Sequence, residues 1–324
     1  MMWFMDTAKS LERHQVWFYL IAIVVGMAVG WMSPEKTQSW ELLLWPVLGV
    51  LLYTTFTQVP LTHVSSALGD RSFLSALLAG NFVLIPLVIG ALLLLLPDDP
   101  AIRLGVLLVL LVPCTDWFIS FTHLGGGDNA RAVAAAPILL IAQLILLPVY
   151  LWLFMGDLAV QLAVGSYLLP AFFGLIVLPL ILAALTQWLS DGHAKASALI
   201  GVLGWLPVPL LTVVVFLIAG SQVRLVSDIG NFFWPVLLVF IFYLISAAVI
   251  GTGLSRFFGF GAPVGLTLTF SFGTRNSFVM LPLALSLPEA WHLAVVVIVL
   301  QSLVELFGMI IYLRWLPQLI RSPD

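Results

Sequence analysis

Charged residues are scarce in this chain, and their scarcity limits what the protein can be. Of its 324 residues, 12 are Lys or Arg and 15 are Asp or Glu, so that 8% are charged, whereas 62% are hydrophobic. A soluble globular domain carries about 25% charged residues. The composition therefore excludes a soluble domain and predicts an all-α polytopic membrane protein surrounded by a lipid bilayer. With so few basic residues there is no basic patch, and no nucleic-acid partner is expected.

Cysteine and clusters of metal ligands are also missing. The single cysteine, Cys114, excludes an intrachain disulfide. The histidines are scattered near the ends of apolar runs without the spacing of metal ligands, so no metal is expected. We find no arrangement of a nucleophile with a base. The sequence therefore predicts neither an enzyme nor a bound cofactor.

Ten apolar runs are long enough to cross a hydrocarbon core, which takes about 20 residues per helix. Short connections with turn or charge signals separate them, and residues 1–324 are interpreted as one transmembrane domain. The predicted spans are Val16–Met32, Glu41–Gln58, Phe73–Leu96, Ile102–His123, Ala130–Phe154, Tyr167–Trp188, Ala198–Ser221, Phe232–Leu254, Ala262–Leu287 and His292–Leu316.

The distribution of Lys and Arg predicts the orientation, because cytoplasmic loops carry an excess of both. If the N-terminus is cytoplasmic, eight basic residues fall in inside segments and three in outside segments. This bias predicts an integral protein of the plasma (inner) membrane with both termini cytoplasmic. The inside residues are Lys9, Arg13, Arg71, Arg131, Lys195, Arg256, Arg314 and Arg321, and the outside residues are Lys36, Arg103 and Arg224.

Similar segments recur in the same order about 150 to 160 residues apart. Gly80-Asn81-Phe82 matches Gly230-Asn231-Phe232, and Pro113–Asp116 lies opposite Phe272–Arg275. The matches predict two halves of five spans each. Because five is odd, the second half is inserted upside down, and inverted repeats with broken helices point to a secondary transporter with a site near the bilayer midplane. The two predicted halves are residues 16–154 and 167–316.

The segment Pro113-Cys114-Thr115-Asp116 interrupts its apolar run at mid-depth. Inserting a carboxylate at the bilayer centre costs roughly 2.5–3.5 kcal/mol on insertion scales. Asp116 is therefore expected to have an interaction partner or a functional role. Proline removes a backbone hydrogen bond, and Thr115 can satisfy a freed group. Arg275, beside Thr274, holds the corresponding place in the second half.

We expect the two breaks to present their polar side chains to one shared cavity as substrate-binding residues. The N-termini of half-helices favour anionic groups, and exposed carbonyl groups favour cations. The alternative is a permanent Asp116–Arg275 ion pair that closes the crossing of the two helices. The predicted substrate-binding residues are Cys114, Thr115, Asp116, Thr274, Arg275, Asn276 and Ser277.

Two intramembrane carboxylates are candidates for ion coupling. Asp116 is the candidate proton carrier, and Glu305 has either a coupling role or a hydrogen-bonded packing role. Gln301 shares a helix face with Glu305 at i, i+4, and Gln143 lies opposite Gln301 in the other half. Both glutamines are predicted to be structural or to line the cavity.

Asn81 and Asn231 are likewise predicted to be structural or to line the cavity. The structural interpretation is helix capping or interhelical hydrogen bonding. Cys114 is open to two interpretations. A buried cysteine is commonly a small inert hydrophobe, but a thiolate at a helix break is a soft ligand that suits thiophilic species such as trivalent arsenic.

The segment Pro113–Asp128, PCTDWFISFTHLGGGD, resembles the P-C-T…G-D segment in the fourth helix of arsenite efflux permeases of the arsenical-resistance type. Those permeases belong to the bile acid/sodium symporter superfamily. Asn81–Pro86 resembles N-x-x-x-x-P in their third helix, and Asn276-Ser277-Phe278 resembles N-N-F in their ninth. The resemblance implies a core of spans three to five and eight to ten, beside a panel of spans one, two, six and seven. It also implies that helices four and nine are broken and crossed, that substrate binds between core and panel, and that Cys114 is the functional thiol.

The chain departs from that family at three places. The arsenite permeases have glutamate where Val279 follows the Asn276-Ser277-Phe278 segment. Sodium-coupled members carry a glutamate and a glutamine where Ser271 and Arg275 stand here. The loss of these acids weakens the case for sodium coupling, while an arginine offers a fork of donors that suits a carboxylate.

The sequence therefore predicts a secondary active transporter that exports arsenite or a related small solute by alternating access. Proton exchange through Asp116, as in an antiporter, is the preferred coupling. The alternative is a sodium- or proton-coupled organic-anion symporter of the bile-acid type, in which Arg275 binds the anion. A third interpretation, a sensor or assembly subunit that transports nothing, is disfavoured because we find no soluble output domain.

Overall fold

The computed structural model describes residues 2–38, 40–59, 70–115, 117–158, 168–190, 194–221, 230 and 232–320. Within these ranges the chain is helical and contains no β-strand beyond one isolated bridge. The helices fall into two compact units, each made of two separate stretches of chain. Unit 1 comprises Met1–Gln58 and Ser166–Asn231, and unit 2 comprises Val59–Gly165 and Phe232–Asp324.

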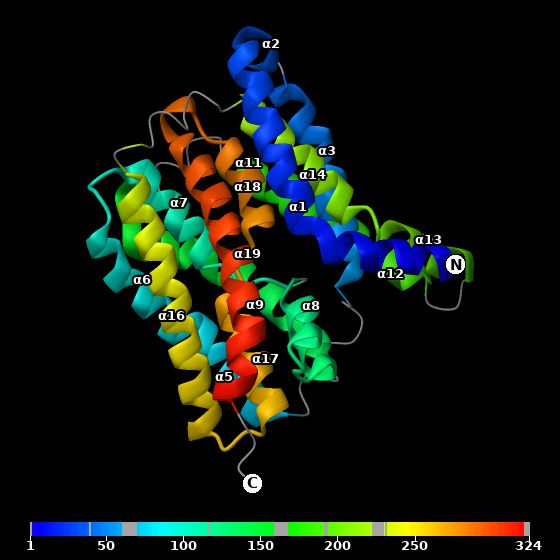
Figure 1. The fold of residues 1–324 in the computed structure, drawn as a ribbon, viewed down its shortest axis with the longest axis vertical. Coiled ribbons are helices and arrows are strands. Elements are labelled where there is room, and N and C mark those ends of the chain that lie inside the picture. The colour runs from blue at the N-terminus through cyan, green and yellow to red at the C-terminus, as the bar shows by residue number, and fades with distance from the viewer. Residues whose placement is uncertain are drawn as a thin grey trace. The chain divides into compact units, whose positions relative to one another are not determined.

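Unit 1 is built around the pairing of α1 (Met2–Met32) with α14 (Pro207–Ser221), which run side by side in Figure 1. Glycines allow their backbones to approach closely, since a Cβ at Gly30 would lie 2.3 Å from the carbonyl oxygen of Gly220. Gly26 meets the same helix in the same way, and such small-residue spacing is typical of packed membrane helices. The other elements are α2 (Pro34–Gln38), α3 (Glu41–Gln58), α11 (Leu168–Ala171), η4 (Phe172–Val177), α12 (Leu178–Ser190) and α13 (Ala194–Leu203).

Unit 2 places α17 (Ala262–Gly273) against α16 (Phe233–Phe257), and α7 (Pro100–Leu110) against α19 (Leu293–Leu319). α17 and α7 have almost completely buried side chains, which puts them at the centre of the unit. The remaining elements are α5 (Arg71–Ala79), η2 (Gly80–Leu84), α6 (Ile85–Leu92), η3 (Leu93–Leu95), α8 (Trp117–Leu124), α9 (Asn129–Met155), α18 (Ser277–Leu285) and η6 (Glu289–Trp291).

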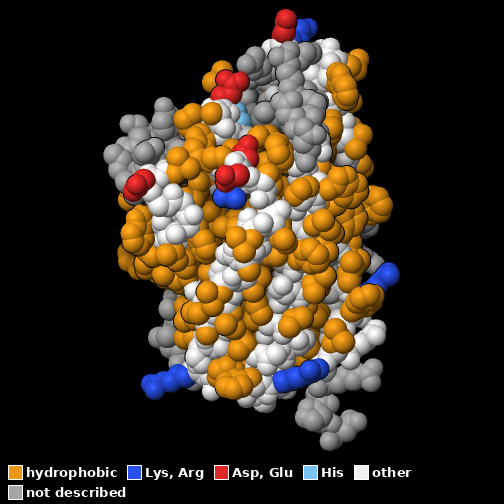
Figure 2. All heavy atoms as spheres, turned by 90° about the vertical axis from the view of Figure 1, so that its left-hand side faces the viewer, with side chains coloured by type: hydrophobic (Ala, Val, Ile, Leu, Met, Phe, Trp, Pro, Cys, Tyr) orange, Lys and Arg blue, Asp and Glu red, His pale blue; other side chains and the backbone are white. Residues whose placement is uncertain are grey.

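The outer surface of the helices is apolar, as a bilayer requires. Among the described residues, five helical segments are long and apolar enough to cross a membrane, and five shorter apolar helices accompany them. Figure 2 shows hydrophobic side chains spread over the described surface on one face, with few charged side chains among them. The chain is therefore an integral membrane protein. The five long segments are Arg71–Leu95, Asn129–Met155, Phe172–Ser190, Phe233–Phe257 and Glu289–Leu319.

The predicted spans agree with the helices to within a few residues, with two exceptions in unit 1. The first helix begins at Met2 and not at Val16, because the charged N-terminal segment continues the helix of the apolar run. Predicted span Ala198–Ser221 is two helices, since α13 ends at Leu203 and α14 begins at Pro207. Pro207 lacks the N–H that a continuous helix would need, so it begins a new helix.

Each unit gathers segments that lie far apart in the sequence. Unit 1 contains the predicted spans one, two, six and seven, and unit 2 contains spans three to five and eight to ten. The grouping is the one that the resemblance implied for panel and core. The inverted repeat that was inferred from the segment matches stays a prediction.

Candidate functional site

Two interrupted helices meet inside unit 2. α7 ends at Leu110 and α8 begins at Trp117, while α17 ends at Gly273 and α18 begins at Ser277. Pro113 ends the first helix because it cannot donate a backbone hydrogen bond. At the second break Thr274 is extended, with φ −96° and ψ 135°. Both interruptions fall where the sequence predicts them.

The backbones of the two breaks satisfy each other through an antiparallel bridge between Pro113 and Arg275. The N–H of Cys114 donates to the carbonyl oxygen of Thr274 at 3.2 Å, and the N–H of Asn276 donates to that of Val112 at 2.8 Å. Unpaired backbone groups are costly away from water. The bridge therefore makes two broken helices tolerable in a buried setting.

Arg275 lies at the negative ends of both broken helices, with only 2% of its surface exposed. Its Nη2 donates to the carbonyl oxygens of Phe272 at 2.8 Å and Ser271 at 3.2 Å, in the last turn of α17. The same atom donates to Oδ1 of Asn81 at 2.8 Å. Nη1 donates to the carbonyl oxygen of Leu110, the last residue of α7, at 3.4 Å. The guanidinium group thus joins four oxygen acceptors from three segments.

Tyr243 of α16 closes this cluster on another side. Its hydroxyl donates to the carbonyl oxygen of Phe272 at 2.6 Å. The Cζ atom of Arg275 lies 5.5 Å from the centroid of the tyrosine ring, within the range of a cation–π contact. The positive charge of Arg275 is therefore held by carbonyl dipoles, an amide and an aromatic face.

A second series of hydrogen bonds connects the break between α17 and α18 to α19. The hydroxyl of Ser277 donates to Oε1 of Gln301, whose Nε2 donates to Oε2 of Glu305 at 2.7 Å. The same carboxylate oxygen accepts the backbone N–H of Arg275 at 2.8 Å. Glu305 is 1% exposed, so its carboxylate satisfies a backbone donor that the helix break sets free.

Of the other predicted site residues, five lie at the two breaks and two cannot be placed. Asp116 and Asn231 lie outside the described residues. Cys114, Thr115, Thr274 and the two residues that follow Arg275 are all buried there. The rings of Trp117 and Phe278, at the starts of α8 and α18, pack with centroids 5.2 Å apart. The positive ends of these two half-helices are therefore close to each other.

Asn81 and Gln143 have different surroundings. Asn81 is inside a continuous helix, in the π-helical turn η2, so the capping interpretation is wrong for it and Asp70 is the N-cap of that helix. Its Nδ2 donates to the hydroxyl of Ser271 at 3.0 Å, which is an interhelical bond. Gln143 of α9 is 2% exposed, and its amide has no hydrogen-bond partner among the described residues.

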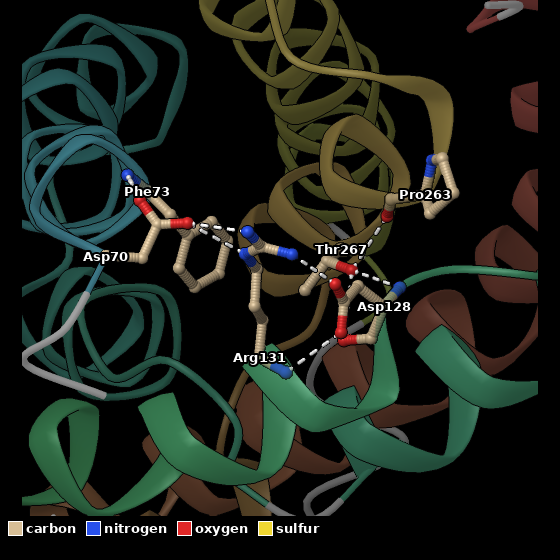
Figure 3. A network of polar contacts seen from close by, with 6 residues as sticks. All are labelled: Asp70, Phe73, Asp128, Arg131, Pro263 and Thr267. Carbon is tan, nitrogen blue, oxygen red and sulfur yellow. Dashed lines mark hydrogen bonds and ion pairs between the residues drawn. The ribbon is translucent and has the colours of Figure 1, made fainter. Parts of the chain in front are cut away.

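Sequence reasoning missed an ionic network at the starts of α5 and α9 (Figure 3). Arg131 lies between two carboxylates, donating from Nη2 to Oδ2 of Asp70 at 2.7 Å and from Nη1 to Oδ2 of Asp128. The backbone N–H of Asp128 donates to the hydroxyl of Thr267 in α17 at 2.8 Å, and that hydroxyl donates to the carbonyl oxygen of Pro263. The network ties the beginnings of three helices together.

Both carboxylates of this network cap helices and are stabilised in their charged form. The backbone N–H of Phe73 and the Arg131 guanidinium hold the pKa of Asp70 below its ordinary value. Burial raises the pKa of Asp128, but hydrogen bonds from the backbone and side chain of Arg131 outweigh it, so this pKa is also lowered. The groups border a cavity of about 350 Å³.

The sequence did contain a signal for this network. Asp128 ends the segment that carries the family resemblance, and Arg131 follows it by one helical turn. The excess of basic residues in inside segments assigns Arg131 only a role in orientation. Among the described residues, no group of three or more His, Cys, Asp or Glu lies close enough together to hold a metal ion.

The chain matches a known family. A model of the Sodium Bile acid symporter family matches residues 45–229, which is more than half of the 324 residues. The matched range includes the first helix break and ends before the second. No curated protein matches the chain.

Proposed function

Because the chain belongs to the sodium bile acid symporter family and is therefore a membrane solute transporter, we propose that it exports arsenite or a related small neutral solute. Family membership also argues against an enzyme. In this proposal unit 2 is the core and unit 1 the panel of an inner-membrane secondary transporter with cytoplasmic termini. Residues 16–154 and 167–316 are its inverted halves, and it works by alternating access.

The observation that carries the proposal is the position of the only thiol. Cys114 lies in the first helix break, 3% exposed, and its backbone is bonded to the second break. A thiol held there can bind a thiophilic solute once the site opens. Thr115, Thr274, Asn276 and Ser277 are buried at the same two breaks, and their hydroxyl and amide groups suit the hydroxyl groups of neutral arsenite.

Arg275 argues for a neutral solute. Both of its terminal nitrogens already donate to protein acceptors, and its side chain is buried. An anion would have to break these bonds to reach the terminal nitrogens, and only Nε has no partner among the described residues. The amide of Gln143, in contrast, has no partner among the described residues and is available to a polar solute.

For coupling we propose proton exchange with Asp116 as the carrier. Glu305 serves a different purpose in this scheme, because its Oε2 accepts the backbone N–H of Arg275 and the amide of Gln301. Protonation of Glu305 would weaken both bonds, so it is the structural carboxylate of the pair.

A second candidate function is sodium- or proton-coupled transport of an organic anion. The observation in its favour is that α8 and α18 both begin at the breaks, with Trp117 and Phe278 in contact. Helix N-termini carry partial positive charge and attract anions. Transport of a carboxylate or sulfonate, with no transport of arsenite, would favour this candidate.

The test replaces Cys114 by Ser, which keeps the size and removes the thiol. We expect loss of arsenite efflux from sensitised cells and of arsenite flux into proteoliposomes, with protein levels unchanged. Thr122→Ser, an equally small change at a buried position of α8, is the matched control and should transport normally. Arsenite efflux by the Cys114→Ser variant at the wild-type rate would exclude the thiol from substrate binding. Imposed proton and sodium gradients in the same vesicles identify the coupling ion.

A further inference from the structure

We propose that the guanidinium group of Arg275 is a tethered cation that occupies the cation position of the crossing helices. Alkali-metal binding at this position is then no part of the transport cycle. The proposal does not depend on which solute is transported. Only the statement about the transport cycle rests on the proposed transporter function. Its structural content, that one side chain fills a site built for a cation, is independent of the solute.

The acceptors around Arg275 form a ligand set of the kind that hard cations take. All four are neutral oxygen atoms, three from backbone carbonyl groups and one from the amide of Asn81. The backbone oxygens belong to the last turns of α7 and α17, where helical hydrogen bonding leaves carbonyl groups free. In membrane transporters, such half-helix C-termini and unwound carbonyl groups bind sodium ions or protons.

The partial negative charges around this position also favour a bound cation. Each helix C-terminus carries roughly half a negative charge, and the ends of α7 and α17 both point at the guanidinium group. Glu305 adds a carboxylate beside the backbone of Arg275. Without a positive group the carbonyl dipoles would face one another in a buried, poorly solvated space.

Arg275 supplies this positive charge permanently. An arginine keeps its charge at every pH at which proteins fold, and its side chain is attached to the break that it stabilises. With 2% of its surface exposed and four bonds made, it leaves no room for a mobile ion among the same oxygens. A mobile ion can be exchanged between the two sides of a membrane, whereas a tethered one cannot.

The experiment removes the tethered charge and asks whether a free ion replaces it. Purified full-length wild type, Arg275→Ala, Arg275→Gln and Arg275→Lys are compared for ²²Na⁺ binding and for thermal unfolding in NaCl and in choline chloride. Wild type and Arg275→Lys should show no saturable sodium binding. Both neutral variants should bind sodium, and their Tm should rise by about 3–5 °C for each tenfold increase of NaCl above the Kd. Adding Asn81→Leu to Arg275→Gln should remove the binding.

Several results would overturn the proposal. Sodium binding to wild type that is lost in Asn81→Leu would show a mobile ion at this position beside Arg275. Folded neutral variants that bind no sodium would show that the oxygens are not a cation site. Failure of the neutral variants to fold in any salt would mean that no free ion replaces the guanidinium group. None of these measurements uses a transported solute, so failure to transport arsenite leaves their outcome unaffected.

Discussion

Glu305 offers the sharpest test of how the broken helices are held. Its Oε2 accepts two donors, the backbone N–H of Arg275 at 2.8 Å and Nε2 of Gln301 at 2.7 Å. Glu305→Ala removes this acceptor and leaves both donors buried. Glu305→Gln can place its amide oxygen where Oε2 lies and keep both bonds, while it loses the negative charge and carries an NH2 group in place of Oε1.

The two substitutions are therefore expected to lower the stability of the protein by different amounts. A buried donor without an acceptor costs about 1–3 kcal/mol, so the two donors together predict a loss of about 2–6 kcal/mol for Glu305→Ala. A loss of 1 kcal/mol lowers the Tm of a domain of 150–250 residues by about 2–4 °C. We therefore expect Glu305→Ala to melt roughly 4–24 °C below wild type. The Tm of Glu305→Gln should lie between those of Glu305→Ala and wild type, and nearer to that of wild type.

The protein carries its own probe for this measurement. Cys114 is the single cysteine and is 3% exposed, so a dye that fluoresces on reaction with thiols reports its exposure during a thermal ramp. Tryptophan fluorescence on the same samples separates opening around Cys114 from unfolding of the whole chain. Equal melting temperatures for the Ala and Gln variants would refute the reasoning, because a shared loss would show that the charge matters and the two accepted bonds do not.

Two further predictions concern the rest of unit 2. Gly251→Ala should destabilise the protein by about 1–3 kcal/mol in thermal melts, since a Cβ there would lie 2.7 Å from the backbone Cα of Thr269. Gly253→Ala, on the same helix and with nothing within 4 Å, should be neutral or stabilising, and a loss as large as that at Gly251 would contradict the packing argument. The carboxylates that cap α5 and α9 have pKa values below their ordinary ones, so their contribution is complete above pH ~4 and is lost as the pH falls through the lowered values. The Tm should therefore fall as the pH drops below about 4, and it should fall less steeply in Arg131→Met. Parallel pH curves for the two proteins would refute the assignment.

The sequence was sufficient to locate the helix breaks, because proline and polar residues inside an apolar run are visible without a structure. The bounds Glu41–Gln58 of α3 were also predicted correctly. The partners of Arg275 were not predictable, because most of them are backbone carbonyl groups that become free only after two helices end beside each other. The ion pair with Asp116, which the repeat suggested as one alternative, stays a prediction because Asp116 lies outside the described residues.

The network around Arg131 was missed for a related reason. Charged residues next to apolar runs are normally assigned to the membrane boundary, and their pairing depends on which helix starts are neighbours in space. Asp70 and Arg131 are 61 residues apart, so no local pattern connects them. The split between α13 and α14 was, in contrast, available from Pro207, and the length of the apolar run concealed it.

The bridge between the two breaks has a consequence for biosynthesis. Leu110 and Arg275 are 165 residues apart, and the backbone groups around Cys114 are bonded to the same late segment. At ~5–20 residues per second of translation, the first break waits roughly ten to thirty seconds for its partner. During that interval its polar backbone is satisfied only by water, by neighbouring chain or by the insertion machinery. A ribosome-bound chain that ends before the second break should therefore be held at the insertion site, and release of the first half into lipid should follow synthesis of Arg275.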